Sequence, residues 1–255
     1  MATVKERSSL YGDSVNIDFY PNSHRYKKEG EKGYLISVTA AVGIIDKSRF
    51  LIPWALRLAK EYMLNDLKEV GTISEQTIDE AIIQHRLKKE RAGDIGSEVH
   101  GFAESVAQAS MSDSDLPAIP ENQPPEVIQG IIAFLDWHNR HDIYFKETER
   151  MVYSKKHDYV GLLDLIAIID KKKYLVDYKT SKGIYSDAYF QVAAYRNAYE
   201  EETGEKLDGT LILHFNKENG EFAIHERPEE DYQKDLSAFL GALAVKKRKK
   251  ELKEY

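Results

Sequence analysis

The hydrophobic and polar positions divide the chain into a first half with helical periodicity and a second half rich in strand-like runs. Residues 15–36 begin with the alternating stretch VNIDFY and contain turn residues, which predicts one or two short β-hairpins. Apolar residues then recur at helical spacing over 51–67 and 74–90. A further helix is expected to begin near Asp94. The first half is therefore predicted to be mainly helical.

Residues 110–126 hold four of the seven prolines and are predicted to form a loop. Beyond them, runs rich in Val, Ile, Leu and Tyr predict strands that alternate with helices, in the order helix 128–141, strands 143–154, 159–170 and 173–181, helix 186–201, strands 210–215 and 222–227, and a last helix from 229. This order predicts an α/β core with a helical N-terminal elaboration. We expect 1–125 and 126–255 to be two parts of one compact unit.

The composition excludes several kinds of site. The 255 residues contain no cysteine, which excludes disulfides, thiolate zinc sites, cysteine nucleophiles and cysteine-ligated iron–sulfur clusters. Any metal must therefore be bound by oxygen or imidazole. The net charge of −7 argues against a protein that coats duplex DNA through bulk positive charge. The one basic concentration, residues 244–255, is most simply a solvated helix end.

Three charged residues interrupt two strands that are otherwise apolar on both faces. Asp164 lies in GLLDLIAIID, and Asp177 and Lys179 lie in YLVDYKT. Because strand side chains alternate, Asp177 and Lys179 project to the same side. A turn over Asp170–Lys173 would place Asp164 opposite Lys179, so that the three groups share one patch; a turn of another length would change this pairing.

Such a patch predicts a divalent cation. Two close carboxylates repel each other, and a hard cation with oxygen ligands, Mg²⁺ or Mn²⁺, would neutralise them. A cation held in this way can polarise a phosphodiester and generate a nucleophile from water, and a lysine beside it can position that water. The alternative is structural: an Asp164–Lys179 ion pair, with Asp177 as a satisfied hydrogen-bond acceptor.

The ordered motifs resemble the PD-(D/E)xK nucleases of the RecB type, and most closely the phage-type exonucleases and the mitochondrial genome maintenance exonuclease. The resemblance covers most of residues 16–240. It implies a restriction-endonuclease-like PD-(D/E)xK core, a central mixed sheet flanked by helices. The segments that carry it are SVT at 37–39, DKS followed by Trp54, GSEVH at 96–100, ERMVYSKKHDYVGLLD at 149–164, VDYKTSK at 176–182 and QVAAY at 191–195.

The resemblance implies the roles of five residues at the centre. Asp164 and Asp177 match the metal-binding acids of the family, and Lys179 matches its catalytic lysine. His100 matches a helix histidine that completes the metal site, to which the backbone carbonyl of Tyr178 also contributes. Without the motif, His100 would more simply be a structural histidine.

Further residues are assigned around this centre. Glu149 matches a glutamate that orders water or a second cation, and Glu147, two residues earlier on the same strand face, is its competitor. Gln191 and Tyr195 are four apart on one helix face and match a QxxxY pair that reaches toward the lysine or the DNA; the alternative is that Tyr195 only packs. Polar residues directly after the second strand are expected to contact DNA phosphates: Thr180, Ser181 and Lys182.

Together these features predict a Mg²⁺- or Mn²⁺-dependent deoxyribonuclease. The family resemblance implies an exonuclease that prefers single-stranded DNA or free ends and acts in DNA replication, recombination or repair, where recombination or replication proteins are expected partners. The helical half is expected to form the DNA channel. Alternatives are a structure-specific endonuclease on the same fold and a catalytically silent DNA-binding or assembly subunit. No iron–sulfur cluster is expected. The chain shows no apolar run of membrane-spanning length and no signal peptide, so we expect a cytoplasmic protein of bacterial or phage origin without a membrane partner.

Overall fold

The computed structural model describes residues 6–215 and 222–253 and confirms the predicted α/β class. A mixed five-stranded sheet forms the centre, in the order β4-β5-β6-β7-β8. β6 and β7 run parallel, and the other neighbouring strands are antiparallel. The strands are β4 (Ile143–Ser154), β5 (Tyr159–Ile169), β6 (Lys172–Lys179), β7 (Gly209–Phe215) and β8 (Phe222–Arg227), which confirms the predicted runs to within two residues.

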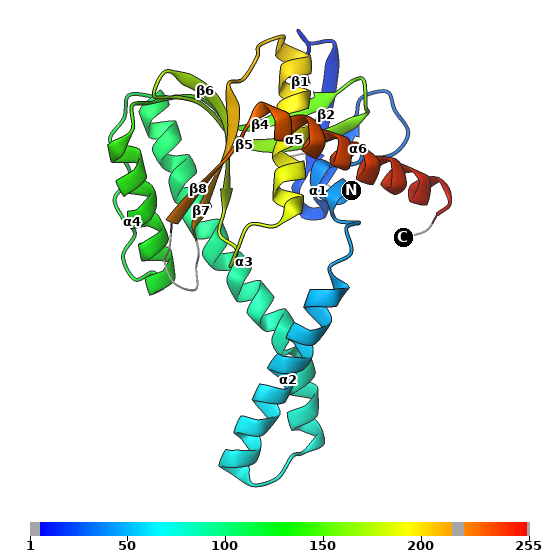
Figure 1. Cartoon of the computed structure of the whole chain (residues 1–255), viewed down its shortest axis with the longest axis vertical. Coiled ribbons are helices and arrows are strands. Elements are labelled where there is room, and N and C mark those ends of the chain that lie inside the picture. Colours follow the sequence, from blue (N-terminus) through cyan, green and yellow to red (C-terminus); the bar gives the residue numbers. More distant parts are fainter. Residues whose placement is uncertain (1–5, 216–221, 254–255) are drawn as a thin grey trace.

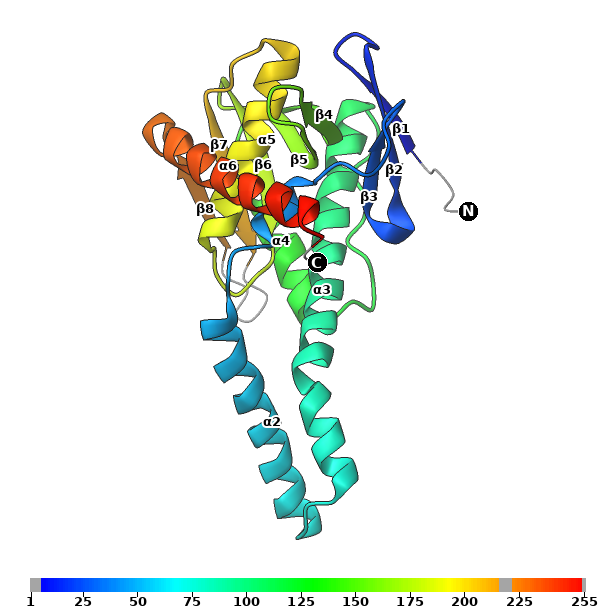
Figure 2. The same cartoon turned by 90° about the vertical axis from the view of Figure 1, so that its right-hand side faces the viewer.

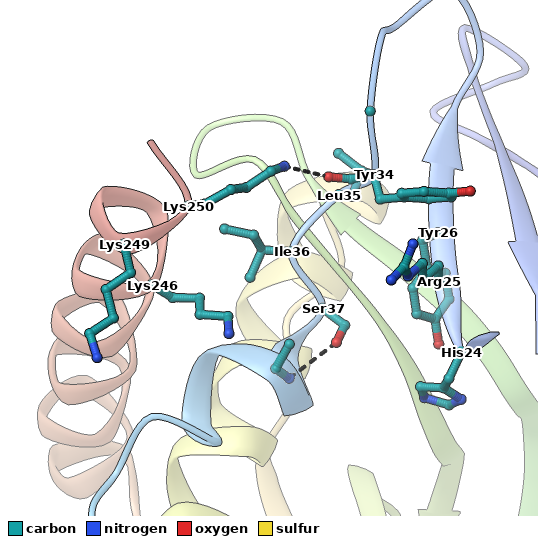
Figure 3. Close-up of a pocket in the computed structure, with 12 residues that line it drawn as sticks. His24, Arg25, Tyr26, Tyr34, Leu35, Ile36, Ser37, Lys246, Lys249 and Lys250 are labelled. Atoms are coloured by element: carbon teal, nitrogen blue, oxygen red, sulfur yellow. Dashed lines mark hydrogen bonds between the residues drawn. The ribbon is translucent and has the colours of Figure 1, made fainter. Parts of the chain in front are cut away.

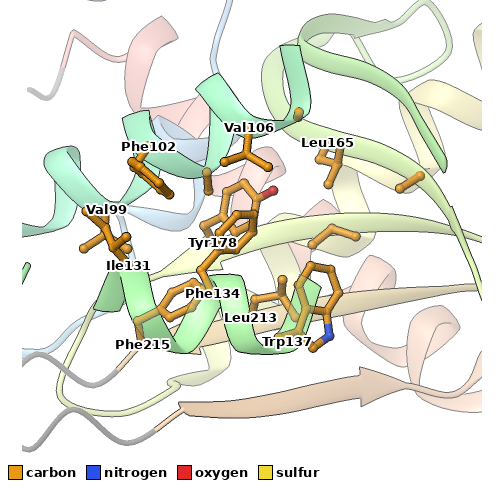
Figure 4. Packing of buried hydrophobic residues seen from close by; sticks show 14 of the residues in the cluster. Val99, Phe102, Val106, Ile131, Phe134, Trp137, Leu165, Tyr178, Leu213 and Phe215 are labelled. Carbon is orange, nitrogen blue, oxygen red and sulfur yellow. The ribbon is translucent and has the colours of Figure 1, made fainter. Parts of the chain in front are cut away.

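Helices cover both faces of this sheet (Figure 1). One face packs against α3 (Glu75–Met111) and α4 (Pro125–Arg140), where Tyr178 contacts Phe134 and Phe215 (Figure 4). The other face packs against α1 (Val38–Val42), α5 (Ser186–Thr203) and α6 (Glu229–Glu251). The sheet is therefore the middle layer of a three-layer core, and its charged residues lie between two apolar layers.

A second, three-stranded sheet confirms the hairpins predicted for the N-terminal region. It consists of β1 (Glu6–Leu10), β2 (Val15–Tyr20) and β3 (Arg25–Lys28), with a 3-10 turn at Pro21–Ser23. Ile17 and Tyr26 pack against Met151 and Val160 of the large sheet. The chain then runs beside β5 through a parallel bridge between Ser37 and Val160. The small sheet and the segment before α1 are thereby fixed beside the start of β5.

A helical hairpin projects from the body of the molecule (Figures 1 and 2). α2 (Ser48–Val70) ends at Gly71, which has φ 80°, and α3 begins after Ser74, whose side chain accepts a hydrogen bond from the Thr77 amide. The predicted new helix near Asp94 is wrong, because α3 continues unbroken to Met111. One helix thus belongs to both the arm and the core.

The turn between β5 and β6 is shorter than the four-residue turn considered above. Asp170 and Lys171 form it, and both have left-handed backbones, with φ 50° and 73°. Ile169 therefore pairs with Lys172 and not with Tyr174. Two residues with positive φ are typical of the two-residue hairpin turn whose twist matches that of the flanking strands.

This turn corrects the predicted partner of Asp164. Leu165 pairs with Val176, whereas the predicted register would have paired it with Tyr178. The pair of Leu165 and Val176 is the last of this ladder, and beyond it the Tyr178 amide donates to the Asp164 side chain. Lys179 is therefore not the cross-strand partner of Asp164.

Candidate active site

The structure brings three of the predicted ligands together where α3 passes β4 and β5. His100 Nε2 lies 3.3 Å from Asp164 Oδ2 and 3.8 Å from Glu149 Oε1. One potential ligand atom from each residue lies within 4.8 Å of the other two. The Tyr178 amide donates a 2.8 Å hydrogen bond to Asp164 Oδ2, which fixes this carboxylate from the β6 side. Residues that are far apart in sequence thus form one cluster.

Local backbone irregularity directs two of these side chains. Glu149 has φ 48°, a left-handed conformation that is uncommon outside glycine and costs on the order of 1 kcal/mol or more. In β5, strict alternation breaks around Asp164, because Leu163 packs under α5 whereas Leu165 packs under α4. Simple strand alternation would therefore not direct both carboxylates at the same histidine.

Glu147, the predicted competitor of Glu149, lies elsewhere. Its carboxylate accepts a 3.0 Å hydrogen bond from Tyr199 Oη and pairs with Arg150. Glu149 has a left-handed backbone and no partner in the ladder between β4 and β5, so the expected common face of Glu147 and Glu149 is wrong. Glu149 is the glutamate that the structure places beside His100.

The charged groups of this cluster shift one another's pKa values. Burial and the charge of Asp164 raise the pKa of Glu149 to about 7. Burial disfavours the charged form of His100, but the Asp164 and Glu149 carboxylates outweigh it and raise the pKa of His100 to about 9. Burial also opposes ionisation of Asp164, yet His100 and Lys179 hold its pKa below the usual range. Negative charge in this cluster thus draws a proton onto the imidazole.

Asp177 and Lys179 form a second, deeper pair on β6. Asp177 is fully buried, and its Oδ2 lies 2.5 Å from Lys179 Nζ. Burial raises the pKa of Asp177, and the charge of Asp164 acts in the same direction. Lys179 loses solvation too, but the Asp177 and Asp164 carboxylates together raise its pKa above the usual range. Lys179 therefore carries the positive charge that keeps this interior carboxylate ionised.

The donor set fits a hard divalent cation. Carboxylate oxygens and one imidazole nitrogen are available, which suits Mg²⁺ or Mn²⁺ in a chain without cysteine. Asp177 Oδ1 is buried and has no partner in the described part of the chain, whereas Oδ2 of the same carboxylate pairs with Lys179, and His100 Nε2 contacts Asp164. Buried polar atoms are normally satisfied, so Asp177 Oδ1 indicates a missing partner.

A cavity of about 520 Å³ opens onto this cluster. His100, Asp164 and Lys179 line it from the core, and Thr180 and Ser181 line it directly after the end of β6. Tyr178 lines it as well, and the remaining wall consists of α3 residues to which the sequence assigned no individual role: Lys89, Gly93, Gly96 and Ser97. Substrate would therefore meet the cluster beside the base of the helical arm.

Gly96, the first residue of the GSEVH segment, received no role of its own from the sequence, although its position offered a signal. It lies four residues before His100 and so on the same face of α3. A β-carbon at Gly96 would approach Thr180 Oγ1 to 2.4 Å, so glycine allows α3 to come close to the end of β6. Glycine inside a helix costs stability relative to alanine, which suggests a packing reason for it.

The remaining predicted residues lie outside the cavity. Gln191 Nε2 donates a 2.8 Å hydrogen bond to Tyr195 Oη, so the predicted pairing of these two side chains is present. Tyr195 is only 3% exposed, which places its ring in the core. Lys182 is exposed on the loop after β6. Gln191 is partly exposed and Tyr195 is buried, so Gln191 is the member of the pair that could contact a ligand.

We expect Gly161→Ala to destabilise the fold through Tyr195. A β-carbon at Gly161 would lie 2.3 Å from Tyr195 Cε1 and 3.1 Å from Val38 Cγ2, and neither buried side chain has room to withdraw. Overpacking of this kind should lower the free energy of unfolding by about 1–3 kcal/mol, measured by urea denaturation.

The matched control is Gly241→Ala, where an added β-carbon meets nothing within 4 Å. This change in α6 should be neutral or stabilising by up to about 1 kcal/mol. Adding Tyr195→Leu to Gly161→Ala should recover part of the lost stability. A Gly161→Ala protein as stable as the unchanged chain would show that Gly161 is not needed for the packing of Tyr195.

The comparisons with known proteins find similarity to solved structures at low sequence identity. No protein-family model matches the chain, and no curated protein matches it in sequence. The crystal structure of SSO0001 aligns with 48% of this chain and 60% of its own, less than two thirds of that protein, at 15% identity and a TM-score of 0.30. The crystal structure of a "Putative exonuclease" from Eubacterium rectale aligns with 63% of this chain and 69% of its own, at 14% identity and a TM-score of 0.39. The function must therefore be inferred from the geometry of the site.

Proposed function

We propose that the chain is a metal-dependent deoxyribonuclease, an exonuclease that acts on single-stranded DNA or free ends through a PD-(D/E)xK-type centre. The observation that carries this proposal is the cluster of His100, Glu149 and Asp164, of which His100 and Asp164 line an open cavity together with Lys179. Two carboxylates, an imidazole and a buried lysine in this arrangement favour phosphodiester hydrolysis over a purely structural ion pair, because the pair of Asp177 and Lys179 leaves Asp177 Oδ1 buried without a partner in the described part of the chain.

The residues of the site would have different roles in the reaction. His100, Glu149 and Asp164 would hold the cation, with Asp177 and the Tyr178 carbonyl as the further ligands that the sequence resemblance implies. When bound, a divalent cation supplies Lewis-acid polarisation of the phosphodiester and lowers the pKa of water. Lys179 lines the cavity and would orient the attacking water and face the developing phosphate charge.

Cations close to the cavity support nucleic acid as the substrate. Lys89 lines the cavity from α3, and Arg86, Lys88 and Arg91 lie exposed on the same stretch of that helix. Thr180 and Ser181 place hydroxyl groups at the opposite wall, and such groups commonly donate to phosphates. A strand that enters along α3 would thus meet local positive charge despite the acidic balance of the whole chain. We expect the strand to be bound in the cytoplasm, alongside recombination or replication proteins. The described helices include none with the length and apolar character of a membrane span.

The test is cleavage of end-labelled oligonucleotides with Mg²⁺, with Mn²⁺ and with EDTA. We expect degradation of linear single-stranded DNA with either metal, no cleavage in EDTA, slower cleavage of blunt duplexes, and no cleavage of a covalently closed single-stranded circle. Cleavage in EDTA would contradict metal dependence, and cutting of the circle would indicate an endonuclease. Binding to DNA without cleavage under every metal condition would indicate the silent subunit.

A further inference from the structure

A second cavity, of about 550 Å³, lies between β3, the segment before α1 and the end of α6 (Figure 3). Residues 33–37 and Ala40 form its floor, and β3 supplies one wall. The opposite wall is the C-terminal part of α6, which carries Lys246, Lys249 and Lys250. None of the residues at the cluster of His100 lines this cavity, so it is a separate feature.

Its lining is strongly cationic. Lys246, Lys249 and Lys250 follow the three- and four-residue spacing that places side chains on one helix face, and Arg25 and His24 approach from β3. The lining contains no aspartate or glutamate. Within the described ranges, no ion pair joins Arg25, Lys246 or Lys249 to a carboxylate. Like charges held this close repel one another, and an anionic ligand would remove that cost.

The helix end alone does not account for this arrangement. Cations near a helix C-terminus are stabilised by its dipole wherever they point around the helix. Lys247 and Arg248 have partners outside the cavity, since Lys247 donates to the His157 carbonyl and Arg248 pairs with Glu251. Lys246 and Lys249 have no such partner among the described residues and face the cavity instead. The sequence-based expectation of a merely solvated helix end is therefore incomplete.

Aromatic and hydroxyl groups complete the cavity. Tyr34 lies 5.0 Å below the Arg25 guanidinium, and its carbonyl accepts a 2.7 Å hydrogen bond from Lys250, which ties α6 to the floor. Tyr26 is 2% exposed and lines the cavity, and no hydrogen bond engages its hydroxyl in the described part of the chain. Phosphate oxygens accept from such donors, and bases stack on exposed tyrosine or arginine planes.

Tyr26 connects the basic cavity to the strand that carries Glu149. Tyr26 lines the cavity and packs in one cluster with Met151, two residues after Glu149 on β4. A flexible strand whose scissile phosphate sits at the cluster would have further phosphates nearby to occupy the basic cavity.

We propose that this cavity is a non-catalytic subsite for phosphate groups of a nucleic acid strand. The proposal rests on the proposed nuclease function for the identity of the polymer. Arg25, Lys246 and Lys249 bind the phosphate oxygens, and Tyr34 contacts a base. The phosphate is either internal to the strand or terminal, and these two sources share the same chemistry.

The test compares two double variants with the same change in net charge. Lys246→Ala/Lys249→Ala removes two cavity cations, whereas Lys234→Ala/Arg248→Ala removes two exposed cations of the same helix that do not line the cavity. Binding of a fluorescent single-stranded oligonucleotide, with a 5′-hydroxyl or a 5′-phosphate, is measured by anisotropy in EDTA over a range of salt. Cleavage with Mn²⁺ is followed in parallel.

We expect the cavity variant to bind the oligonucleotide on the order of tenfold more weakly. The slope of the logarithm of its binding constant against the logarithm of the salt concentration should fall in magnitude by about 1.4, because two phosphate contacts on a single strand are lost. The control variant should bind within about twofold of the unchanged chain. Equal loss for both oligonucleotides assigns internal phosphates, and loss confined to the phosphorylated one assigns the terminal group. Identical binding by the two double variants overturns the subsite. If the two double variants differ in DNA binding as expected but none of the proteins cleaves DNA, the subsite stands and only the proposed nuclease activity is overturned.

Discussion

Replacing Asp164 with asparagine should abolish cleavage while leaving the protein folded. The Asp164 carboxylate is one of three ligand atoms within 4.8 Å of one another, so its loss removes both a ligand and the charge that attracts the cation. Asparagine can still accept the 2.8 Å hydrogen bond from the Tyr178 amide, which preserves the local backbone. We expect a fall in rate on the order of 10³-fold, equivalent to about 4 kcal/mol of transition-state stabilisation. Metal-dependent degradation of labelled single-stranded DNA measures it.

A second measurement separates metal binding from chemistry. Mn²⁺ affinity of the same variant, followed by electron paramagnetic resonance of the free ion, should weaken by at least tenfold. Asp115→Asn is the matched control, because Asp115 is exposed in the loop between α3 and α4 and has no partner in the described ranges. This control should retain activity and affinity. An Asp164→Asn protein with near-normal cleavage would remove Asp164 from the metal site.

The strand pattern predicted the core sheet well because its signals are local. Apolar runs bounded by polar turns fix where β4, β5 and β6 begin and end, and the structure keeps those bounds. The register of β5 on β6 was wrong because it depends on whether Asp170 and Lys171 adopt left-handed backbones, which neither residue strongly prefers. The continuity of α3 was missed for a similar reason. Gly93 and Gly96 weaken helix propensity, but α3 is held by tertiary packing at both ends.

In the candidate site, too, local features could be predicted from the sequence, whereas features that depend on tertiary structure could not. His100 and Asp164 were expected together only through family resemblance, since 63 intervening residues give no local signal of their contact. Glu149 reaches them because its backbone is left-handed, a conformation that strand alternation cannot anticipate. The basic cavity is a purely tertiary feature: the lysines of α6 are visible in sequence, but the Arg25 and Tyr34 that face them lie more than 200 residues earlier.

The pair of Asp177 and Lys179 offers the sharpest distinction between a catalytic and a structural role. Substituting Lys179 with methionine should leave the fully buried Asp177 carboxylate without its 2.5 Å partner. Breaking a buried pair from one side costs about 3–5 kcal/mol, so we expect that loss in the free energy of unfolding at pH 7. Cleavage should be lost as well. Urea denaturation and the labelled-strand assay measure the two effects.

The double variant Asp177→Asn/Lys179→Met separates those effects. Removing both charges takes away the uncompensated carboxylate, so stability should return to within about 1–2 kcal/mol of the unchanged chain. Activity should stay at the level of Lys179→Met, because asparagine and methionine supply neither a charged ligand nor an ammonium group for the phosphate. A double variant that regains cleavage along with stability would mean that Asp177 and Lys179 serve the fold alone, and the centre would then reduce to His100, Glu149 and Asp164.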